Sequence, residues 1–329
     1  MAIGSGLGSS LGMSAVTATY GAFVAPTRFF RARNYSITRA ANRVQGEGIR
    51  QDGLLPLGAH YVETTEAATA SVELDVQTKG FGLLLQAITG GTSTITGSTG
   101  AYLQTHTLGD PFGKNHTWQV GAPYRTGAVA AQTLRGGKVV SAEFSCEATG
   151  ILGVTVQLDG RQFLATDTYA TPSYDATDVF HGRQAVIKVG VDGSEVAVAG
   201  VRSGSVSFSR SHDADDYTMD GTGLKAEPVL NGLYDITGSF EVDWLDKATF
   251  QDLVVNNTAR SIIWEFVGAT LTGTTKSTFR IDIPNATFEG DMQGVGGVQE
   301  LTNTWNFTSR QGSTAALPKI EYITADSAL

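Results

Sequence analysis

The feature that most constrains this chain is a stretch of sequence that occurs twice, about half the chain length apart. Residues 71–85 read SVELDVQTKGFGLLL and residues 239–253 read SFEVDWLDKATFQDL. Ser, Glu, Asp, Lys and Leu recur at corresponding positions, each displaced by 168 in a chain of 329 residues. A repeat of this kind indicates an internal duplication, with two unrelated β-rich domains as the alternative.

Each copy has the pattern of a strand followed by a short helix. Before Thr78 and before Asp246, apolar residues alternate with acidic ones, which is the period of a strand with one buried face. Thr78 and Asp246 are good helix N-caps, and apolar residues at helical spacing follow them. Gly-Gly at 90–91 and Asn-Asn at 256–257 are typical stop signals. The residues of the two helical stripes are Phe81, Leu84, Leu85 and Ile88, and Phe250, Leu253 and Val254.

Further matches follow in the same order along both copies. The matched segments are Trp118 with Trp264, residues 155–158 with 304–307, and residues 35–48 with 206–221. The two Trp residues are only 146 positions apart, so the first copy contains about 22 extra residues between its helix and its Trp strand. These residues lie within 91–116, which is rich in Gly, Ser and Thr, and we expect a long loop there.

We therefore expect a mainly β protein with two tandem domains, each containing one short α-helix. Residues 1–19 are rich in glycine and small residues and are expected to form a flexible N-terminal arm. The first domain is expected over residues 20–175, including the loop 91–116, and the second over residues 176–329. The join lies in the polar segment 166–178.

Composition and motifs give no support for catalysis. Cys146 is the only cysteine and is expected to pack as a small apolar side chain. The histidines lack the spacing of a zinc site, the acidic segment 212–221 lacks the order of a calcium loop, and no nucleophile motif is present. We expect no enzyme activity, no metal and no cofactor.

Charge and hydropathy limit the possible partners and the compartment. A net charge of −9 argues against wrapping DNA through phosphate contacts, but it is compatible with a surface along which DNA slides. The N-terminus lacks the pattern of a signal peptide, and no apolar run reaches the length of a membrane span. We expect synthesis in a cytoplasm.

Several segments resemble the tail tube proteins, or major tail proteins, of long-tailed, siphovirus-type bacteriophages. The similar segments are IGSGLGSSLGMSAVTATYGAFVAPTRFF at 3–30, NHTWQVGAPYRTG at 115–127, LRGGKVVSAEFSCEATGILGVTVQLDGR at 134–161, VRSGSVSFS at 201–209, AEPVLNGLYDITGSFEVDW at 226–244 and ATFEGDMQGVGG at 286–297. They span most of the chain, and the resemblance comes from their number and order. The longer segment of the first copy departs from the second copy, and its role is open.

The resemblance implies a structural virion protein of the tail, assembled in the cytoplasm of the bacterial host. Each of its two tandem tail-tube-type domains would be a β-barrel or sandwich with one short flanking α-helix. Neighbouring chains would extend each other's sheets and close into rings, and stacked rings would form a tube that conducts the genome. The duplication favours a ring of three chains with pseudo-sixfold symmetry, with a ring of six as the alternative.

The resemblance also implies the partners. These are further copies of the chain, the tail tip and terminator proteins, the tape measure protein, and phage DNA that passes through the lumen without specific binding. A non-enzymatic surface β-sandwich, such as an adhesin or a carbohydrate-binding module, is the alternative function.

Four carboxylates are the candidate site residues. Glu73 and Asp75, and likewise Glu241 and Asp243, lie on the opposite face of their strand from the apolar residues. Both copies retain them, which makes them candidates for lining the lumen. The alternative is that they face solvent or pair with a neighbouring lysine.

Overall fold

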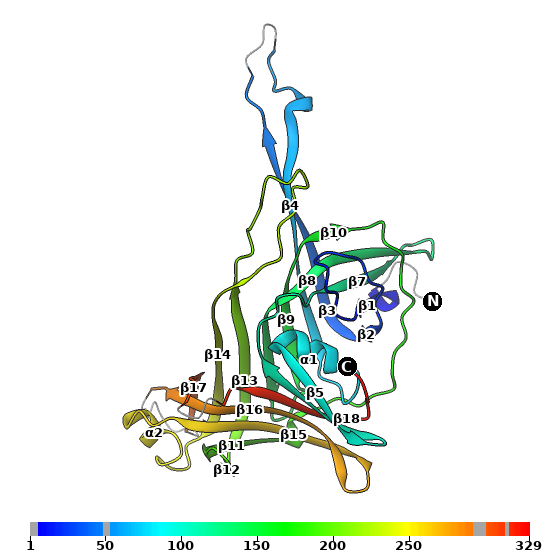
Figure 1. Cartoon of the computed structure of the whole chain (residues 1–329). Helices are drawn as coiled ribbons and strands as arrows, with labels where there is room; N and C mark the ends of the chain where they lie inside the picture. The colour runs from blue at the N-terminus through cyan, green and yellow to red at the C-terminus, as the bar shows by residue number, and fades with distance from the viewer. Residues whose placement is uncertain (1–5, 49–52, 292–300, 313–315) are drawn as a thin grey trace.

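The computed structural model describes residues 6–48, 53–291, 301–312 and 316–329 (Figure 1). Most of the regular structure is β-strand. The elements of the first half are β1 Ser10–Met13, β2 Arg28–Phe30, β3 Ala32–Gln45, β4 Tyr61–Asp75, α1 Gly82–Thr89, β5 Gly90–Ser98, β6 Ala101–Leu108, β7 His116–Pro123, β8 Val129–Glu147, β9 Gly153–Gly160 and β10 Gln162–Leu164. The elements of the second half are β11 Ala185–Val191, β12 Ser194–Ala197, β13 Val201–His212, β14 Leu230–Asp243, α2 Gln251–Val255, β15 Arg260–Thr272, β16 Thr275–Glu289, β17 Thr302–Ser309 and β18 Lys319–Thr324. Single 3-10 turns cover Gly6–Gly8, Gly58–His60 and Gly182–Gln184.

The strands pair in the same order in the two halves. In the first half β3 pairs with β4, β4 with β9, β9 with β8, and β8 with β7. In the second half β13 pairs with β14, β14 with β17, β17 with β16, and β16 with β15. All these pairs are antiparallel, and the register agrees, because Glu73 faces Thr155 as Glu241 faces Thr304. The repeated sequence thus has a repeated architecture.

A β-bulge occurs at the same place in both halves. One extra residue interrupts the register, Arg33 in β3 and Arg202 in β13. From these registers Ser36 corresponds to Ser205, since both face the repeated serine of the next strand. The alignment that the sequence suggested for this strand is therefore displaced by two residues, which keeps every side chain on the same face.

The two halves share strand pairs across the expected domain join. β8 pairs with β13 over residues 141–147 and 203–209. At the other side β18 lies between β16 and β6, so the last strand of the chain joins a strand of the first half. The boundaries at residues 19 and 175 stay a prediction, but strand pairing continues from one half to the other.

The N-terminal segment differs from the flexible arm expected over residues 1–19. β1 pairs with both β2 and β7, and Leu11 and Met13 are buried. In the second half β11 has the same place, between β12 and β15. The sequence did not predict β1, because small residues dominate this segment and the partner strand β7 lies about 100 residues away. Residues 1–5 lie outside the described residues.

The segment 91–116, expected to be a loop, contains most of a β-hairpin. β5 and β6 pair with each other, and β6 also pairs with β18. Gly97 and Gly100 have positive φ at the turn, a conformation that favours glycine. Gln104 and His106 of β6 are fully buried. A Thr- and Ser-rich segment forms strands here because β18 supplies a partner.

The two predicted helices are present as α1 and α2, but only one of the predicted caps is used. α1 begins after Phe81 without a side-chain cap. The Thr78 backbone N–H donates instead to the carbonyl of Asp178, at 2.9 Å, outside the helix. Asp246 Oδ1 accepts a hydrogen bond from the Thr249 N–H at 2.9 Å, so it caps the turn that leads into α2.

Both predicted helix stops are confirmed. Gly90 follows α1 with φ 70°, and Asn257 lies after α2 with φ 45°. A β-carbon at Gly90 would come within 2.4 Å of the Arg210 guanidinium and 2.9 Å of the Gly109 carbonyl oxygen. Glycine is therefore required at this position both for its backbone conformation and for its close neighbours.

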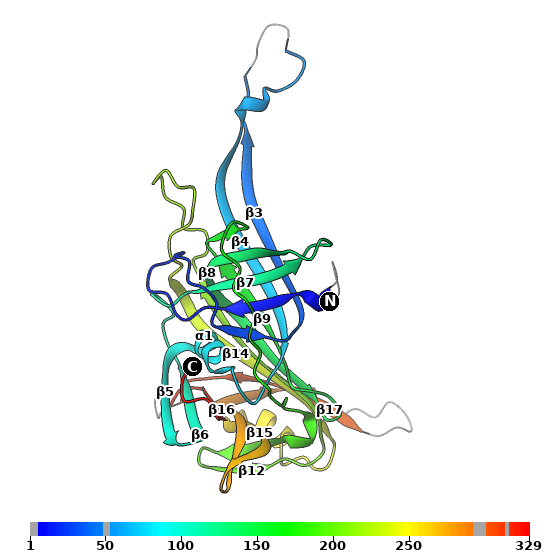
Figure 2. The same ribbon diagram turned by 90° about the vertical axis from the view of Figure 1, so that its right-hand side faces the viewer.

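The core lies between the apolar face of the long strands and the covering elements α1, α2, β7 and β15. The predicted α1 stripe is buried in full. The large aromatic residues of the second half that are buried in the core are Phe180, Phe208, Phe240, Phe250, Trp264, Phe266, Phe279, Phe288, Trp305, Phe307 and Tyr322. The β3–β4 hairpin leaves this body and projects far beyond it (Figures 1 and 2). Near its end Leu54 is 98% and Leu55 is 78% exposed.

Candidate functional site

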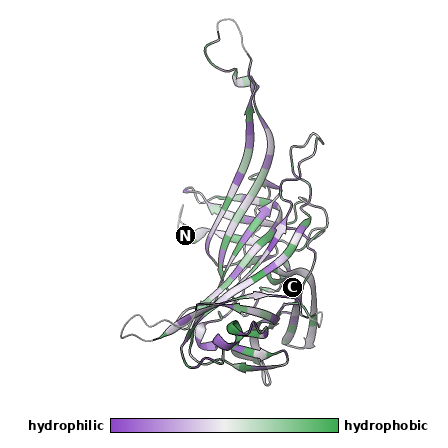
Figure 3. Ribbon diagram, turned by 90° about the vertical axis from the view of Figure 1, so that its left-hand side faces the viewer, coloured by the Kyte–Doolittle hydropathy of each residue, from purple (hydrophilic) through white to green (hydrophobic). Residues whose placement is uncertain are grey.

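The candidate site is a broad polar surface that we call the open face. It is one side of the strands β3, β4, β9, β8, β13, β14, β17 and β16, which follow one another by direct pairing. Where these strands cover the body, every second side chain lies on the open face, exposed or half-buried, while the alternate side chains pack against the core. Figure 3 shows the resulting alternation of hydrophilic and hydrophobic residues along the long strands.

The open face is rich in small polar groups. Its residues are Asn34, Ser36 and Thr38 of β3, Thr69, Ser71, Glu73 and Asp75 of β4, Thr155 and Gln157 of β9, Ser141, Glu143, Ser145 and Glu147 of β8, Ser203, Ser205, Ser207 and Ser209 of β13, Asp235, Thr237, Ser239, Glu241 and Asp243 of β14, Thr302, Thr304, Asn306 and Thr308 of β17, and Thr287 and Glu289 of β16. Hydroxyl groups bond across strands, as Ser205 does with Ser239 at 3.2 Å. Such a surface is hydrophilic, and it includes an open depression lined by Glu147, Ser203 and Ser239.

The structure places all four predicted carboxylates on the open face. Asp75 and Asp243 each form an ion pair with the arginine of the neighbouring bulge, Arg33 and Arg202. These ion pairs are equivalent in the two halves. Each aspartate is thus paired with an arginine of the neighbouring strand. The sequence-based alternative to a lumen position was that these carboxylates face solvent or pair with a lysine.

Among the described residues, no cationic side chain forms an ion pair with Glu73 or Glu241. Ser203 Oγ donates to Glu241 at 3.3 Å, and Glu73 lies opposite Thr155. The free negative charge of the predicted set therefore comes from Glu73 and Glu241.

Sequence reasoning missed further acidic residues of the same surface. Glu143 and Glu147 of β8, Asp235 of β14 and Glu289 of β16 are exposed on the open face. The signal was present in the SAEFSCE segment, where polar and apolar residues alternate as they do in the repeat. Within the described ranges, the arginines of the two bulges are the cationic side chains that pair with carboxylates of this face.

Two buried ion pairs fasten the connection between β13 and β14 to the first half. Lys225 Nζ lies 2.5 Å from Asp159 Oδ1, and Lys138 Nζ lies 2.5 Å from Glu227 Oε1. Burial raises the pKa of Asp159 in spite of its lysine partner and lowers the pKa of Lys138. Breaking either pair would leave a buried charge uncompensated, so these contacts fix the connection in place.

Two histidines, His106 and His116, and the cysteine Cys146 are buried. His106 Nδ1 lies 2.7 Å from Ser93 Oγ, and burial lowers its pKa to about 4. Burial lowers the pKa of His116 to about 4 as well, and it raises the pKa of the Cys146 thiol to about 11. Among the described residues no group of three His, Cys, Asp or Glu could hold a metal ion. No helix in the described part of the chain is long and apolar enough to cross a membrane.

Comparison with known proteins identifies one family. The model of the family described as phage tail tube protein matches residues 6–309, which is nearly the whole chain. A search among curated proteins finds no significant match.

Proposed function

Because this chain belongs to the phage tail tube protein family and is a structural protein of the virion tail, we propose that three copies close into a ring with the open face inward. Stacked rings then form the conduit through which the genome enters the host. The observation that carries this proposal is the open face itself, a continuous polar surface to which both repeated halves contribute the same strands in the same order.

The duplication supports three chains in a ring. Each chain contributes two units with the same strand order, so three chains present six similar units around an axis. Within the chain β8 and β13 already join one unit to the next. A ring of six full-length chains, with twelve units, is the alternative.

The chemistry of the open face suits a wall along which DNA moves. Unpaired glutamates repel the phosphate backbone, and the two bulge arginines are engaged by aspartates instead of being free to bind phosphate. Serine and threonine side chains are short and leave the wall smooth. DNA in such a channel is confined without being bound at specific positions.

The remaining partners follow from the same proposal. A tube built from identical rings ends at other tail proteins, for which the tail tip and terminator proteins are the candidates. The tape measure protein and then DNA occupy its interior. The protein has no catalytic role in this scheme, and its assembly takes place in the cytoplasm of the bacterial host.

Electron microscopy of the purified full-length chain tests the proposal. Rings or tubes with threefold symmetry in averaged images are the expected result. Rings with a sixfold arrangement of whole chains would mean that six chains, and not three, form the ring. Particles that remain discrete monomers at all concentrations would contradict the tube function.

A further inference from the structure

We infer that neighbouring chains of the ring join through β3 of one chain and the end of β16 of the next, in the register that joins β13 to β8 within the chain. The inference rests on the proposed ring and names the two surfaces that form it. It follows from the equivalence of β3 with β13 and of β16 with β8 in the repeated architecture.

The join between the two halves serves as the template. β7 occupies one edge of β8 as far as Gly137. Beyond that point β13 takes over this edge, with Ser141 opposite Ser209 and Glu143 opposite Ser207, while β9 occupies the other edge. β8 therefore pairs with β7 of its own half along its first part and with β13 of the other half along its last part.

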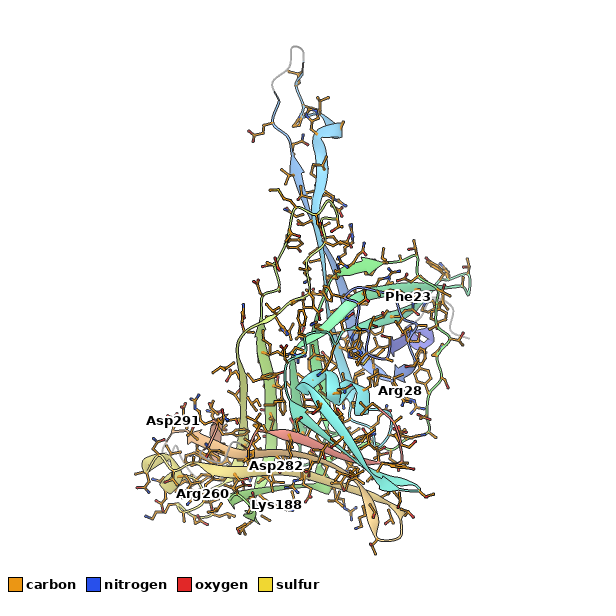
Figure 4. The ribbon with its side chains drawn as sticks, in the orientation of Figure 1. Phe23, Arg28, Lys188, Arg260, Asp282 and Asp291 are labelled. Carbon is orange, nitrogen blue, oxygen red and sulfur yellow. The ribbon has the colours of Figure 1, made fainter. Side chains whose placement is uncertain are left out.

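At the end of β16, the edge that corresponds to the β13-pairing edge of β8 has no partner strand among the described residues. Ala286 pairs with β15 on one edge and with β17 on the other. β15 reaches no further, whereas Phe288 and Glu289 continue to pair with β17. Among the described residues, no strand takes the edge that β15 leaves, at the place where β13 lies beside β8. Figure 4 places Asp291, two residues beyond Glu289, at the outer end of these strands.

The outer edge of β3 is the complementary surface. β3 is 14 residues long, and in the described part of the chain β4 is the strand that pairs with it. In the second half the matching strand β13 uses its second edge to pair with β8. A long strand with one unpaired edge invites association, and a ring removes that edge by pairing it.

The registers fix which residues meet. Ser141 faces Gln157 of β9 as Glu289 faces Asn306 of β17, so Glu289 takes the place of Ser141. Ala40 takes the place of Ser209, because both lie four residues beyond the serines that correspond in β3 and β13. The joint therefore sets Ala40 of one chain opposite Glu289 of the next.

The same register sets Thr38 opposite Asp291. In the template the equivalent pair is Ser207 opposite Glu143, again a hydroxyl residue opposite a carboxylate. No two like charges face each other at these positions, and the small side chains of β3 leave room for the acidic ones. The polar open face thus continues from one chain to the next.

Cysteine cross-linking of assembled protein tests this register. In a Cys146→Ala background, Ala40→Cys with Glu289→Cys is expected to give a ladder of disulfide-linked species that ends at the trimer on a non-reducing gel. The pair Ser36→Cys with Glu289→Cys is the register control, since Ser36 lies four residues, or about 13 Å, from the predicted partner. The pair Ser141→Cys with Ser209→Cys, which lies in the template, is expected to oxidise within the monomer.

The outcomes separate the joint from the tube function. A ladder for Ala40 with Glu289 and none for the register control supports the joint, and a ladder that ends at six chains supports it in a larger ring. Tubes that form without this cross-link, or equal cross-linking of the control, overturn the register and leave the tube function intact. Wild-type chains that form neither rings nor tubes contradict the tube function itself. Thr38→Cys with Asp291→Cys repeats the test if the first variant does not fold.

Discussion

At the scale of single residues, the charge of the open face depends on which carboxylates have a cationic partner. Asp75 and Asp243 are paired with arginines, whereas Glu73 and Glu241 lie beside hydroxyl residues. The exposed ion pairs contribute little to stability, at most about 1 kcal/mol each. In the proposed tube their effect is on the charge of the inner wall, because each ion pair cancels a negative charge that would repel DNA and a positive charge that would bind it.

Charge reversal of the two glutamates tests their place in the channel. We predict that phage carrying Glu73→Lys and Glu241→Lys assembles normal tails but ejects DNA several-fold more slowly, because lysines in the wall bind phosphate. This binding should weaken as the salt concentration rises. Single-particle ejection kinetics at several salt concentrations measure the effect.

A control with the same change in net charge uses carboxylates away from the open face. Asp178→Lys and Asp192→Lys alter exposed residues of the linker and of the β11–β12 turn. This variant should eject at the wild-type rate. Unchanged ejection by the glutamate variant, with intact tubes by microscopy, would place Glu73 and Glu241 outside the lumen.

The buried histidine His106 predicts a loss of stability in acid. Its pKa is lowered from 6.5 to about 4 in the folded protein, so the folded state takes up its proton less readily than the unfolded chain. The contribution of neutral His106 to the free energy of unfolding is fully present above pH 6.5. It is lost as the pH falls from 6.5 towards 4, and it amounts to at most about 3 kcal/mol. Denaturant unfolding at a series of pH values measures this slope.

Replacement of the histidine separates this effect from other titrations. His106→Asn retains a polar atom near Ser93 and should reduce the slope between pH 6.5 and 4, while the buried His116 continues to contribute to it; the variant is less stable at pH 7. His60→Asn, at an exposed position, should leave the slope unchanged. An unaltered slope in the His106 variant would assign the acid sensitivity to other groups.

At the scale of elements, the β5–β6 hairpin is the main difference between the two halves. β6 pairs with β18 over residues 102–107 and 319–324, and β18 in turn pairs with β16. The insertion thus fastens the first half to the second at a place distant from the β8–β13 pair. It has no counterpart after α2, where β15 begins within a few residues.

Removal of this hairpin should destabilise the whole chain. Replacing residues 91–108 by a short Gly-Ser linker leaves Ile320 and Tyr322 of β18 without cover, and each buried side chain of this size contributes about 1.5–3 kcal/mol. We therefore expect a loss of several kcal/mol and rapid amide exchange in β18. Thermal unfolding followed by circular dichroism, and hydrogen exchange, are the measurements. A melting temperature equal to that of the wild type would show that the hairpin is an accessory loop.

The same elements show what the sequence could and could not predict. Alternation and helical spacing identified β4, β14 and both helices, because these signals are local. The hairpin at 91–108 was missed because Ser, Thr and Gly are compatible with either a loop or a strand, and the deciding partner is β18, far along the chain. The Arg33–Asp75 pair was missed for the same reason, since a bulge in the neighbouring strand creates it.

At the scale of the whole molecule, the β3–β4 hairpin is positioned to contact another ring of the proposed tube. It projects beyond the body in both views, and Leu54 and Leu55 near its end are almost fully exposed (Figures 1 and 2). Exposed leucines at the end of a long projection indicate a binding surface. A contact of this head-to-tail kind repeats without closing, which is the geometry of a filament.

Substitution of these leucines should separate ring formation from stacking. We predict that Leu54→Ser with Leu55→Ser changes the melting temperature by no more than about 2 °C, because both side chains are already exposed. Rings should form normally while tubes become short or rare in micrographs. Leu233→Ser, at a 92% exposed position of β14, is the control and should leave tube length unchanged. Tubes of full length in the double variant would assign stacking to other contacts.

The single projecting hairpin has a consequence for how successive rings are oriented. In the proposed ring of three chains, a wall of six similar units looks almost the same after each step of one unit, so the wall alone allows two alternating rotations of the next ring about the tube axis. The hairpin occurs in the first half only, because the equivalent connection between β13 and β14 is fastened down by Lys225 and Asp159. Three hairpins on a wall of six units mark every second position. The two rotations of the next ring are then no longer equivalent. Each ring therefore determines the rotation of the next ring along the tail.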